Sequence, residues 1–86
     1  MEDLYFVYII YSPKINQFYI GSTNDLEARL RHHNSGATPS TKKGAPEWTI
    51  SYIEDFQTKS DALKREIQIK RKKSRKYIDF LISSAG

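Results

Sequence analysis

The chain of 86 residues contains no cysteine. A disulfide scaffold and a thiolate zinc site are therefore excluded, and a small chain without disulfides fits a reducing cytoplasm. Long hydrophobic runs are also missing, because the apolar stretch 4–11 is too short to span a bilayer. The sequence begins Met-Glu-Asp, which is acidic where a secretory signal would be basic. We expect a soluble cytoplasmic protein with no membrane partner.

Positive charge is concentrated in one part of the chain, whose formal net charge is +4. Residues 59–76 hold nine Lys and Arg against two acidic residues, and the remainder holds five basic and eight acidic residues. A basic segment on an acidic body indicates a polyanionic partner such as nucleic acid. A solvated lysine-rich helix face explains the same pattern, and charge alone does not choose between the two.

The length predicts a single domain, 1–86, with room for one small core and one shallow site. The run 4–11 is β-branched and aromatic throughout, which predicts a central strand covered on both faces. Residues 17–21 predict a second strand, so 4–21 is expected to form a hairpin. Whether its side chains share a face depends on a register that the sequence does not show.

A helix and a loop are expected next. Asn24 predicts an N-cap, with Glu27 as its capping-box partner, and Gly36 suits the left-handed position that ends a helix. Residues 35–46 have almost no apolar side chains, which predicts an exposed loop. Leu26 and Leu30 mark the apolar side of the helix.

The second half predicts a third strand and two helices. In 47–56, Trp48, Ile50 and Tyr52 alternate with polar residues, which is typical of a strand. Thr58 with Asp61 predicts the cap of a helix over 59–73. Ser74 is expected to interrupt it before a last helix whose apolar side is Ile78, Leu81 and Ile82. The fold class is therefore α+β, a three-stranded, mainly antiparallel sheet flanked by three helices.

Two tyrosines, one in each hairpin strand, are candidates for chemistry. Tyr8 lies in the expected central strand and Tyr19 in its partner. Aromatic residues are common in strands for packing reasons alone, so two half-buried core tyrosines with solvated hydroxyls explain both positions. Two phenols on one face would instead supply paired hydroxyls to a site.

Arg29 and His33 are four residues apart and share a face of the first helix. A guanidinium donates two hydrogen bonds to a phosphate, and an imidazole donates to phosphate or moves a proton. Alternatively, Arg29 pairs with Asp25 on the surface, and His33 is solvated in a frayed last turn. His32 points about 100° away around the helix and suits that solvated role better.

Glu66 is the candidate metal ligand. The apolar stripe of its helix is expected to run through Leu63 and Ile67, with Glu66 on the same side. A carboxylate facing a core is costly unless it is paired or binds a metal. Pairing with Lys70, four residues on, explains Glu66 equally well on the residues alone.

Val7-Tyr8-Ile9 and Tyr19-Ile20-Gly21 resemble the paired motifs of the GIY-YIG nuclease superfamily. The arginine-bearing and glutamate-bearing helices follow in the superfamily's order, so the resemblance covers about residues 5–82. Short bacterial proteins similar to the N-terminal nuclease domain of excinuclease C are the nearest likeness. Val7 stands where glycine is usual, whereas the second motif is complete.

The resemblance implies a metal-dependent endonuclease that hydrolyses DNA phosphodiester bonds, with a place in DNA repair or recombination. Glu66 would bind Mg²⁺, or another divalent cation such as Mn²⁺, with water and phosphate oxygens completing the shell. Both tyrosine hydroxyls would point into the active site, where Tyr8 helps to activate water although a phenol is a poor base at neutral pH. Arg29, with Tyr19 and His33, would stabilise charge on the phosphate.

Basic residues are expected to hold the DNA without reading its sequence, so structure is the more suitable basis for recognition. Residues 70–76 contain six cations, and because they cannot all face one way, some are plain solvation. Thr41 in the loop 35–46 is an expected companion. The lysines and arginine expected to contact DNA are Lys42, Lys43, Lys70, Lys72, Lys73, Arg75 and Lys76.

Two other functions stay open. Many members of the superfamily carry an Asn beyond the glutamate helix, and this chain has none after Asn34. A nucleic-acid-binding domain that has lost turnover is therefore one alternative. The other is a protein-interaction module whose basic tail serves only solubility, which a salt-sensitive DNA-binding assay would separate from both.

Overall fold

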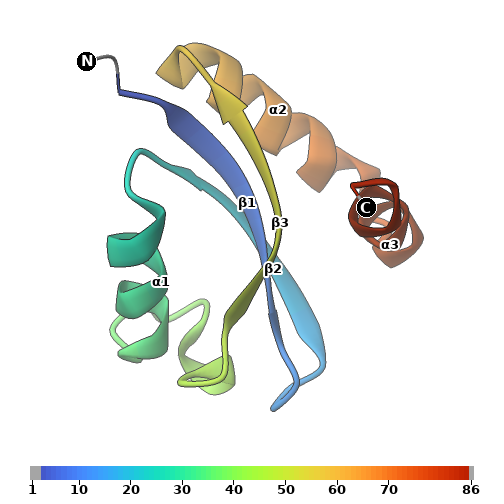
Figure 1. The fold of residues 1–86 in the computed structure, drawn as a ribbon. Helices are drawn as coiled ribbons and strands as arrows, with labels where there is room; N and C mark the ends of the chain where they lie inside the picture. The colour runs from blue at the N-terminus through green and yellow to red at the C-terminus, as the bar shows by residue number, and fades with distance from the viewer. Residues whose placement is uncertain (1–2, 86) are drawn as a thin grey trace.

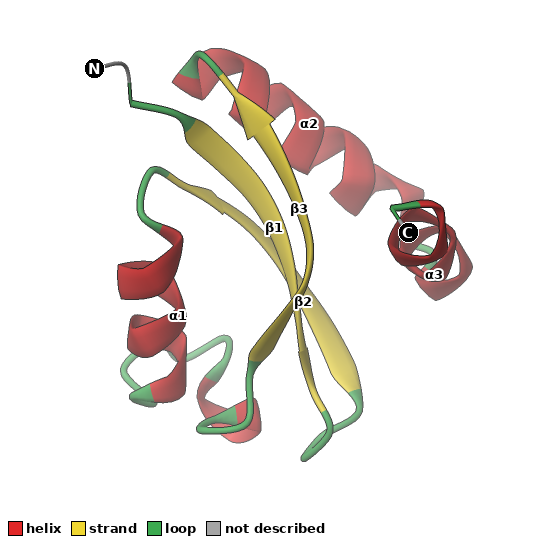
Figure 2. Cartoon of the chain, in the orientation of Figure 1, coloured by secondary structure: helices red, strands yellow, loops and turns green. Residues whose placement is uncertain are grey.

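The computed structural model describes residues 3–85, so the acidic start Met1-Glu2, on which the signal-peptide argument depended, lies outside the described residues. One sheet separates two layers of helices (Figures 1 and 2). None of the helices described is long and apolar enough to cross a membrane. The elements are β1 (Tyr5–Ser12), β2 (Gln17–Thr23), α1 (Leu26–Asn34), the 3₁₀ turn η1 (Lys42–Gly44), β3 (Thr49–Phe56), α2 (Lys59–Lys72) and α3 (Arg75–Ser84).

The predicted hairpin and the predicted central strand are confirmed. The strand order is β2-β1-β3, and β1 pairs antiparallel with both neighbours. Four consecutive residues of β1 are buried because helices cover both faces of the sheet. Val7 and Ile9 face α2 and α3, whereas Tyr8 and Ile10 face α1. This division produces two small cores, one on each face, and the α+β class is confirmed.

The third strand differs from the expected alternation. It begins at Thr49, and its register with β1 shifts between Ile9 and Ile10, so that Ile9 lies opposite Tyr52 and Ile10 opposite Ile50. Ser51 is the extra residue of this β-bulge, which reverses the faces of the side chains beyond it. Tyr52 therefore packs in the core beneath α2, whereas Trp48 packs in the core beneath α1.

The start of α1 also differs from the prediction. The N-cap is Asp25 and not Asn24, because the Asp25 carboxylate accepts a hydrogen bond of 3.1 Å from the backbone N–H of Ala28. A carboxylate at this position satisfies an otherwise unpaired amide of the first turn. The predicted end is confirmed, since Gly36 has a left-handed φ of 79°.

The loop 35–46 is not wholly exposed, contrary to the prediction, and it contains the turn η1. Thr41 is buried, which is inconsistent with an exposed DNA contact. Its carbonyl accepts a 2.8 Å hydrogen bond from Trp48 Nε1, and the Gly44 carbonyl accepts one of 2.8 Å from Ser12 Oγ. A Cβ at Gly44 would lie 2.6 Å from Trp48 Cε2, so glycine lets the loop close over the indole ring.

Thr58 caps α2 as predicted, and Ser74, which was expected only to interrupt the helix, caps α3. Thr58 Oγ1 accepts from the Asp61 N–H and Ser74 Oγ from the Tyr77 N–H, each at 3.1 Å. Lys73, with a left-handed φ of 46°, ends α2 and lets the chain turn into α3. Leu81 packs into the core as predicted.

The expected apolar stripe of α2 is wrong. Leu63 is 40% exposed and Ile67 is 49% exposed. The packed side of α2 is instead marked by Ala62 and Ile69, which are buried against β1. The small Ala62 side chain lets the helix approach the sheet closely, and this choice of face rotates Glu66 toward the edge of the sheet.

A polar network joins β3, α2 and α3 on the same face. Arg65 donates two hydrogen bonds to Glu54, from Nε at 2.8 Å and from Nη2 at 3.0 Å, and Nη1 donates to the Tyr77 hydroxyl at 3.3 Å. Tyr52 also donates to Glu54. Burial opposes the charge of Glu54, but the bonds from Arg65 and Tyr52 outweigh it and lower the pKa of this carboxyl. The network fixes α2 relative to the sheet.

Candidate active site

The hairpin register places Tyr8 and Tyr19 on one face of the sheet. Tyr8 lies opposite Gly21, and Tyr19 lies opposite Ile10, so the two rings are diagonal neighbours on the side covered by α1. A Cβ at Gly21 would lie 2.6 Å from Tyr8 Cζ and would overlap the hydroxyl. Glycine at position 21 therefore provides the space in which the Tyr8 phenol lies.

A buried chain of hydrogen bonds begins at Tyr8. Its hydroxyl lies 2.8 Å from His33 Nε2, and His33 Nδ1 lies 2.8 Å from Thr41 Oγ1. Tyr8 and His33 are each only 2% exposed, so His33 is not the solvated residue of a frayed turn. Both ring nitrogens are bonded within the protein, which fixes the plane of the imidazole. His33 thus contacts the phenol and does not reach out toward a phosphate.

Burial changes the proton affinities of this pair. Burial raises the pKa of Tyr8 to about 12, although the nearby Arg29 guanidinium opposes the shift. Burial also lowers the pKa of His33, and the charge of Arg29 adds to this effect. At neutral pH, His33 is therefore a neutral imidazole and Tyr8 a neutral phenol. One ring nitrogen can donate a hydrogen bond while the other accepts one.

Arg29 lies beside an open cleft of about 590 Å³ on the same face. Tyr19 and His33 contribute to its wall, and the edge of the Tyr19 ring meets His33 at 5.0 Å between centroids. Arg29 is exposed and, among residues 3–85, forms no ion pair, so the expected alternative of a surface pair with Asp25 is not present. A guanidinium held at a cleft wall is available to an anion.

Glu66 reaches the site from the opposite face of the sheet. Its carboxylate accepts a 2.6 Å hydrogen bond from Ser22 Oγ on β2 and pairs with Lys70 Nζ at 2.5 Å. The Glu66 side chain is 14% exposed. Because β2 is an edge strand, side chains from both faces can meet beyond it. Lys70 connects the two groups, since its ammonium also lies 6.0 Å from the centre of the Tyr19 ring.

The donor set around Glu66 suits a hard cation. Among the described residues 3–85, no group of three or more acidic or histidine side chains could enclose a metal ion. Glu66 and Ser22 offer oxygen donors alone, and Mg²⁺ is commonly held by one or two carboxylates, with waters and phosphate oxygens in the other positions. The residues present therefore fit a magnesium ion that is bound largely through its substrate.

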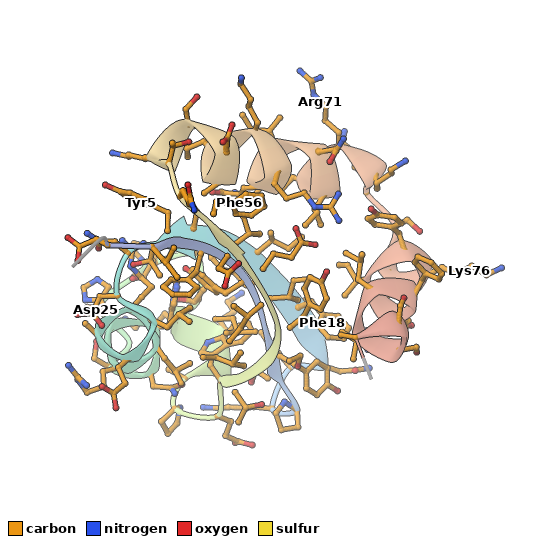
Figure 3. The ribbon with its side chains drawn as sticks, turned by 45° about the horizontal axis from the view of Figure 1, so that its top comes forward. Tyr5, Phe18, Asp25, Phe56, Arg71 and Lys76 are labelled. Carbon is orange, nitrogen blue, oxygen red and sulfur yellow. The ribbon has the colours of Figure 1, made fainter. Side chains whose placement is uncertain are left out.

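The predicted DNA-contacting residues divide into separate groups. Lys42 and Lys43 are exposed in η1, beside α1, whereas residues 70–76 lie across the sheet at the junction of α2 and α3 (Figure 1). Lys76 projects away from the body of the protein (Figure 3), and Lys72 lies 5.2 Å from the centre of the Tyr77 ring. The structure does not bring the two basic segments together.

Arg75 has intramolecular partners that its place in the basic segment did not indicate. Its guanidinium donates to the Asn16 carbonyl at 3.0 Å and to Asn16 Oδ1 at 2.8 Å, and it lies 5.0 Å from the centre of the Phe18 ring. These contacts attach the start of α3 to the β1–β2 turn. Arg75 therefore orders the hairpin as well as carrying charge.

The roles of two residues in the site were missed in the sequence, although Thr41 had been named as a companion of the DNA-contacting lysines. Thr41 anchors His33, and Ser22 anchors Glu66. Ser22 directly follows the Tyr19-Ile20-Gly21 motif, and this position in the sequence could have indicated that it belongs to the site. Thr41 lies in a polar loop, where no local pattern marks a buried hydroxyl.

The site therefore brings a phenol, an imidazole, a guanidinium and a carboxylate to the edge of a small α+β sheet. A sequence comparison identifies the family of the chain, because the family model described as the GIY-YIG catalytic domain matches residues 4–78. The chain belongs to this family of nuclease domains.

Similar curated proteins are short and carry the name UPF0213. One from Haloquadratum walsbyi is 37% identical over 70 residues, covering 81% of this chain and 78% of its own length. One from Staphylococcus haemolyticus is 38% identical over 66 residues, covering 77% and 79% respectively. One from Limosilactobacillus reuteri is 32% identical over 83 residues, covering 94% and 85%. No solved structure matches the chain.

Proposed function

We propose that the protein is a Mg²⁺-dependent endonuclease that hydrolyses phosphodiester bonds of DNA. The arrangement of Tyr8, Arg29 and Glu66 around one end of β2 carries this proposal. Arg29 borders the cleft beside the buried phenol, and Glu66 supplies a carboxylate at the neighbouring edge. Family membership supports the nuclease class, and a role in DNA repair or recombination is part of the proposal.

Tyr8 acts as a proton relay in this proposal. A pKa of about 12 keeps phenolate scarce at neutral pH. The neutral His33 lets Tyr8 accept a proton without first forming phenolate. Nε2 of His33 takes the phenolic proton while the Tyr8 oxygen takes a proton from the attacking water. Thr41 holds the imidazole in the tautomer that accepts, when Nδ1–H donates to Thr41 Oγ1. His33 is then a positioning and proton-accepting partner of Tyr8.

Arg29 and Tyr19 stabilise the phosphate as the water oxygen bonds to phosphorus and the bond to the leaving oxygen breaks. A preorganised guanidinium opposes the charge that develops on the equatorial oxygens. Because Arg29 lies near the Tyr8 hydroxyl, its movement onto a phosphate would also expose that hydroxyl to water. Glu66 would hold Mg²⁺, which supplies Lewis-acid stabilisation of the phosphate and the leaving group.

The decisive experiment is a nicking assay on branched and linear DNA, with Mg²⁺ or with EDTA. We expect the wild-type protein to cleave only when Mg²⁺ is present, and we expect Glu66→Gln not to cleave. Glutamine keeps the oxygen that accepts from Ser22 but removes the charge that a metal needs, so the fold should persist. Glu47→Gln removes an exposed carboxylate away from the site and should cut normally. Equal cleavage by Glu66→Gln and wild type would show that Glu66 is not the metal ligand.

A DNA-binding domain without turnover is the second candidate. The ion pair between Glu66 and Lys70 favours it, because this pair already satisfies the carboxylate. In the same assay, this candidate predicts salt-sensitive binding without strand cleavage in either metal condition. Absence of salt-sensitive binding would instead favour the protein-interaction module.

A further inference from the structure

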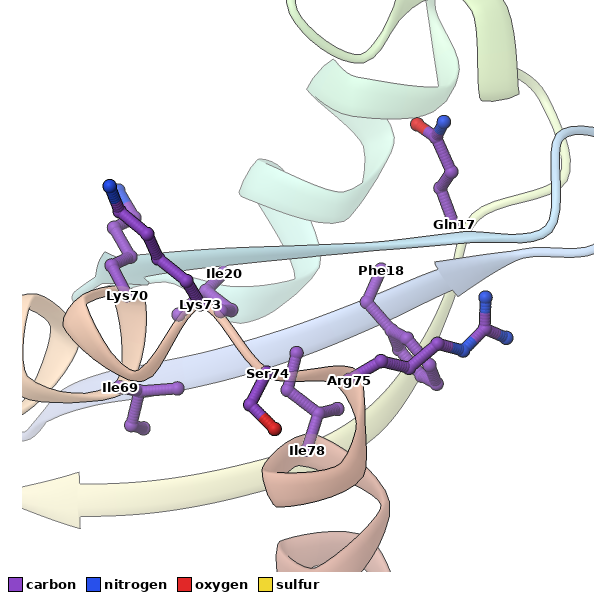
Figure 4. A pocket seen from close by; sticks show the side chains of 9 residues that line it. All are labelled: Gln17, Phe18, Ile20, Ile69, Lys70, Lys73, Ser74, Arg75 and Ile78. Carbon is purple, nitrogen blue, oxygen red and sulfur yellow. The ribbon is translucent and has the colours of Figure 1, made fainter.

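A groove of about 280 Å³ runs along the free edge of β2, where α2 turns into α3 (Figure 4). Its floor is apolar and is formed by Phe18 and Ile20 from β2 together with Ile69 and Ile78 from the helices. Such a floor offers nothing to a bare phosphate. It suits a flat apolar group that comes from outside the protein.

The rim of the groove is basic. Lys70 and Lys73 reach out on the same side of β2 (Figure 4). Arg75 lies at the other end, where its guanidinium is hydrogen-bonded to Asn16 and lies 5.0 Å from the centre of the Phe18 ring, so that it provides a fixed positive charge at that end of the floor. Lys70 lies in the last turn of α2 and Lys73 is the left-handed residue that ends this helix, and both line the groove. Cations on both sides of an apolar floor match a nucleotide, in which an uncharged base lies between two phosphates.

The groove begins where the candidate active site ends. Lys70 lines the groove, pairs with Glu66 at 2.5 Å and lies 6.0 Å from the centre of the Tyr19 ring. A strand whose phosphate lies at Glu66 would therefore continue directly into the groove. The nucleotide in the groove would be next to the bond that is cut.

We infer that this groove binds one unpaired nucleotide of DNA, adjacent to the scissile phosphate. A base inside a duplex is stacked and paired, and therefore cannot contact the floor. The volume is below the usual range for drug-sized ligands, about 300–1,000 Å³, which limits the occupant to a single base. This inference rests on the proposed function and specifies its substrate as DNA with a flap or a branch.

The first test compares three DNAs in EDTA, which prevents cleavage. They are a plain duplex, a duplex with one unpaired nucleotide at a nick, and the same molecule with an abasic unpaired nucleotide. We expect the base to strengthen binding by at least about fivefold over the abasic form, as contacts to a single base typically do. Equal affinity for the DNA with the unpaired base and for its abasic form would overturn the inference that the groove binds a base.

The second test locates the base. With 5-iodouracil at the unpaired position, near-ultraviolet cross-linking should modify Phe18 or residues 73–78. Modification of Tyr19, His32 or His33 would place the base in the other cleft and overturn the inference. The groove and the cleft beside Arg29 both contain aromatic side chains that can react with the iodinated base, so the cross-linking chemistry does not favour either site.

A matched pair of variants tests the rim. Lys73→Gln should weaken binding to the DNA with the unpaired nucleotide more than binding to plain duplex. Lys64→Gln removes the same charge from an exposed position of α2 that does not line the groove, and it should leave this ratio unchanged. Equal effects of the two variants would overturn the assignment of Lys73. If the wild-type protein bound no DNA at all, the proposed nuclease function would be refuted. If it cleaved DNA but showed no preference for the base over the abasic form, only the inference about the groove would be refuted.

Discussion

Replacing Gly21 with alanine should destabilise the protein because the new methyl group would occupy the space of the Tyr8 phenol. Its Cβ would lie 2.6 Å from Tyr8 Cζ. Carbon atoms pack at about 3.5–4.0 Å, so the ring would have to retreat by roughly 1 Å. Overpacking of this kind costs about 1–3 kcal/mol. The 2.8 Å bond to His33 would also be lost, which adds about 1 kcal/mol.

The expected loss is therefore about 2–4 kcal/mol of the free energy of unfolding. Without the clash, the change should be neutral or slightly stabilising, because alanine reduces the entropy of the unfolded chain by about 0.4–1 kcal/mol. Urea denaturation followed by the fluorescence of Trp48, which packs in the same core as Tyr8, measures the difference.

A double-mutant cycle isolates the contact. In a Tyr8→Leu background the ring is absent, so Gly21→Ala should cost little. A destabilisation of the same size in both backgrounds would refute the reasoning, because the loss would then come from the strand backbone and not from the phenol. A loss below about 0.5 kcal/mol in the wild-type background would do the same.

Three further outcomes are expected. Arg29→Ala should slow cleavage by roughly 10²-fold, with a much smaller loss of DNA affinity, as removal of one transition-state donor typically does. Single-turnover rates measure the cleavage step and binding isotherms measure the affinity, and equal losses in both would show that Arg29 only holds the DNA backbone. Changing Lys72, Lys73 and Lys76 together to Gln should reduce the slope of log affinity against log salt by about 0.9 for each lost duplex phosphate contact, so by about three such steps at most; an unchanged slope would place the DNA elsewhere. Because burial lowers the pKa of His33 below its unfolded value near 6.5, its contribution to stability should be complete above about pH 6.5 and should decline as the pH falls toward the folded pKa; urea titrations at about pH 7.5 and 5.5 should show this decline in wild type and a smaller one in His33→Asn.

Local patterns explain why the elements were predictable. The run in β1 is apolar and β-branched, so it requires cover on both faces wherever it is placed. Thr58 and Ser74 cap helices through hydrogen bonds to amides three residues away, which depend on nearby sequence alone. At the start of α1 two adjacent residues, Asn24 and Asp25, could both have served as the cap. Only the backbone conformation distinguishes them.

The face of α2 illustrates what a periodic pattern leaves open. Leu63 and Ile67 have the larger apolar side chains, yet they remain exposed, and the helix packs through Ala62 and Ile69. Helix rotation is determined by how closely the backbone can approach the sheet, and a small residue at the contact permits the closest approach. The prediction weighed hydrophobicity and not size, so it was wrong about the side chains that pack on the sheet, whereas the pairing of Glu66 with Lys70 that it offered is present.

The sequence by itself determined the order of strands and helices, the family and the candidate residues, because these follow from local patterns and short motifs. Tertiary structure decided what the candidates contact. The hairpin register placed Tyr8 over Gly21, the closed loop brought Thr41 to His33, and the rotation of α2 brought Glu66 to Ser22. These contacts join residues from 8 to 44 positions apart, so they depend on register, helix rotation and loop closure, which are properties of the packed chain and not of any segment in it.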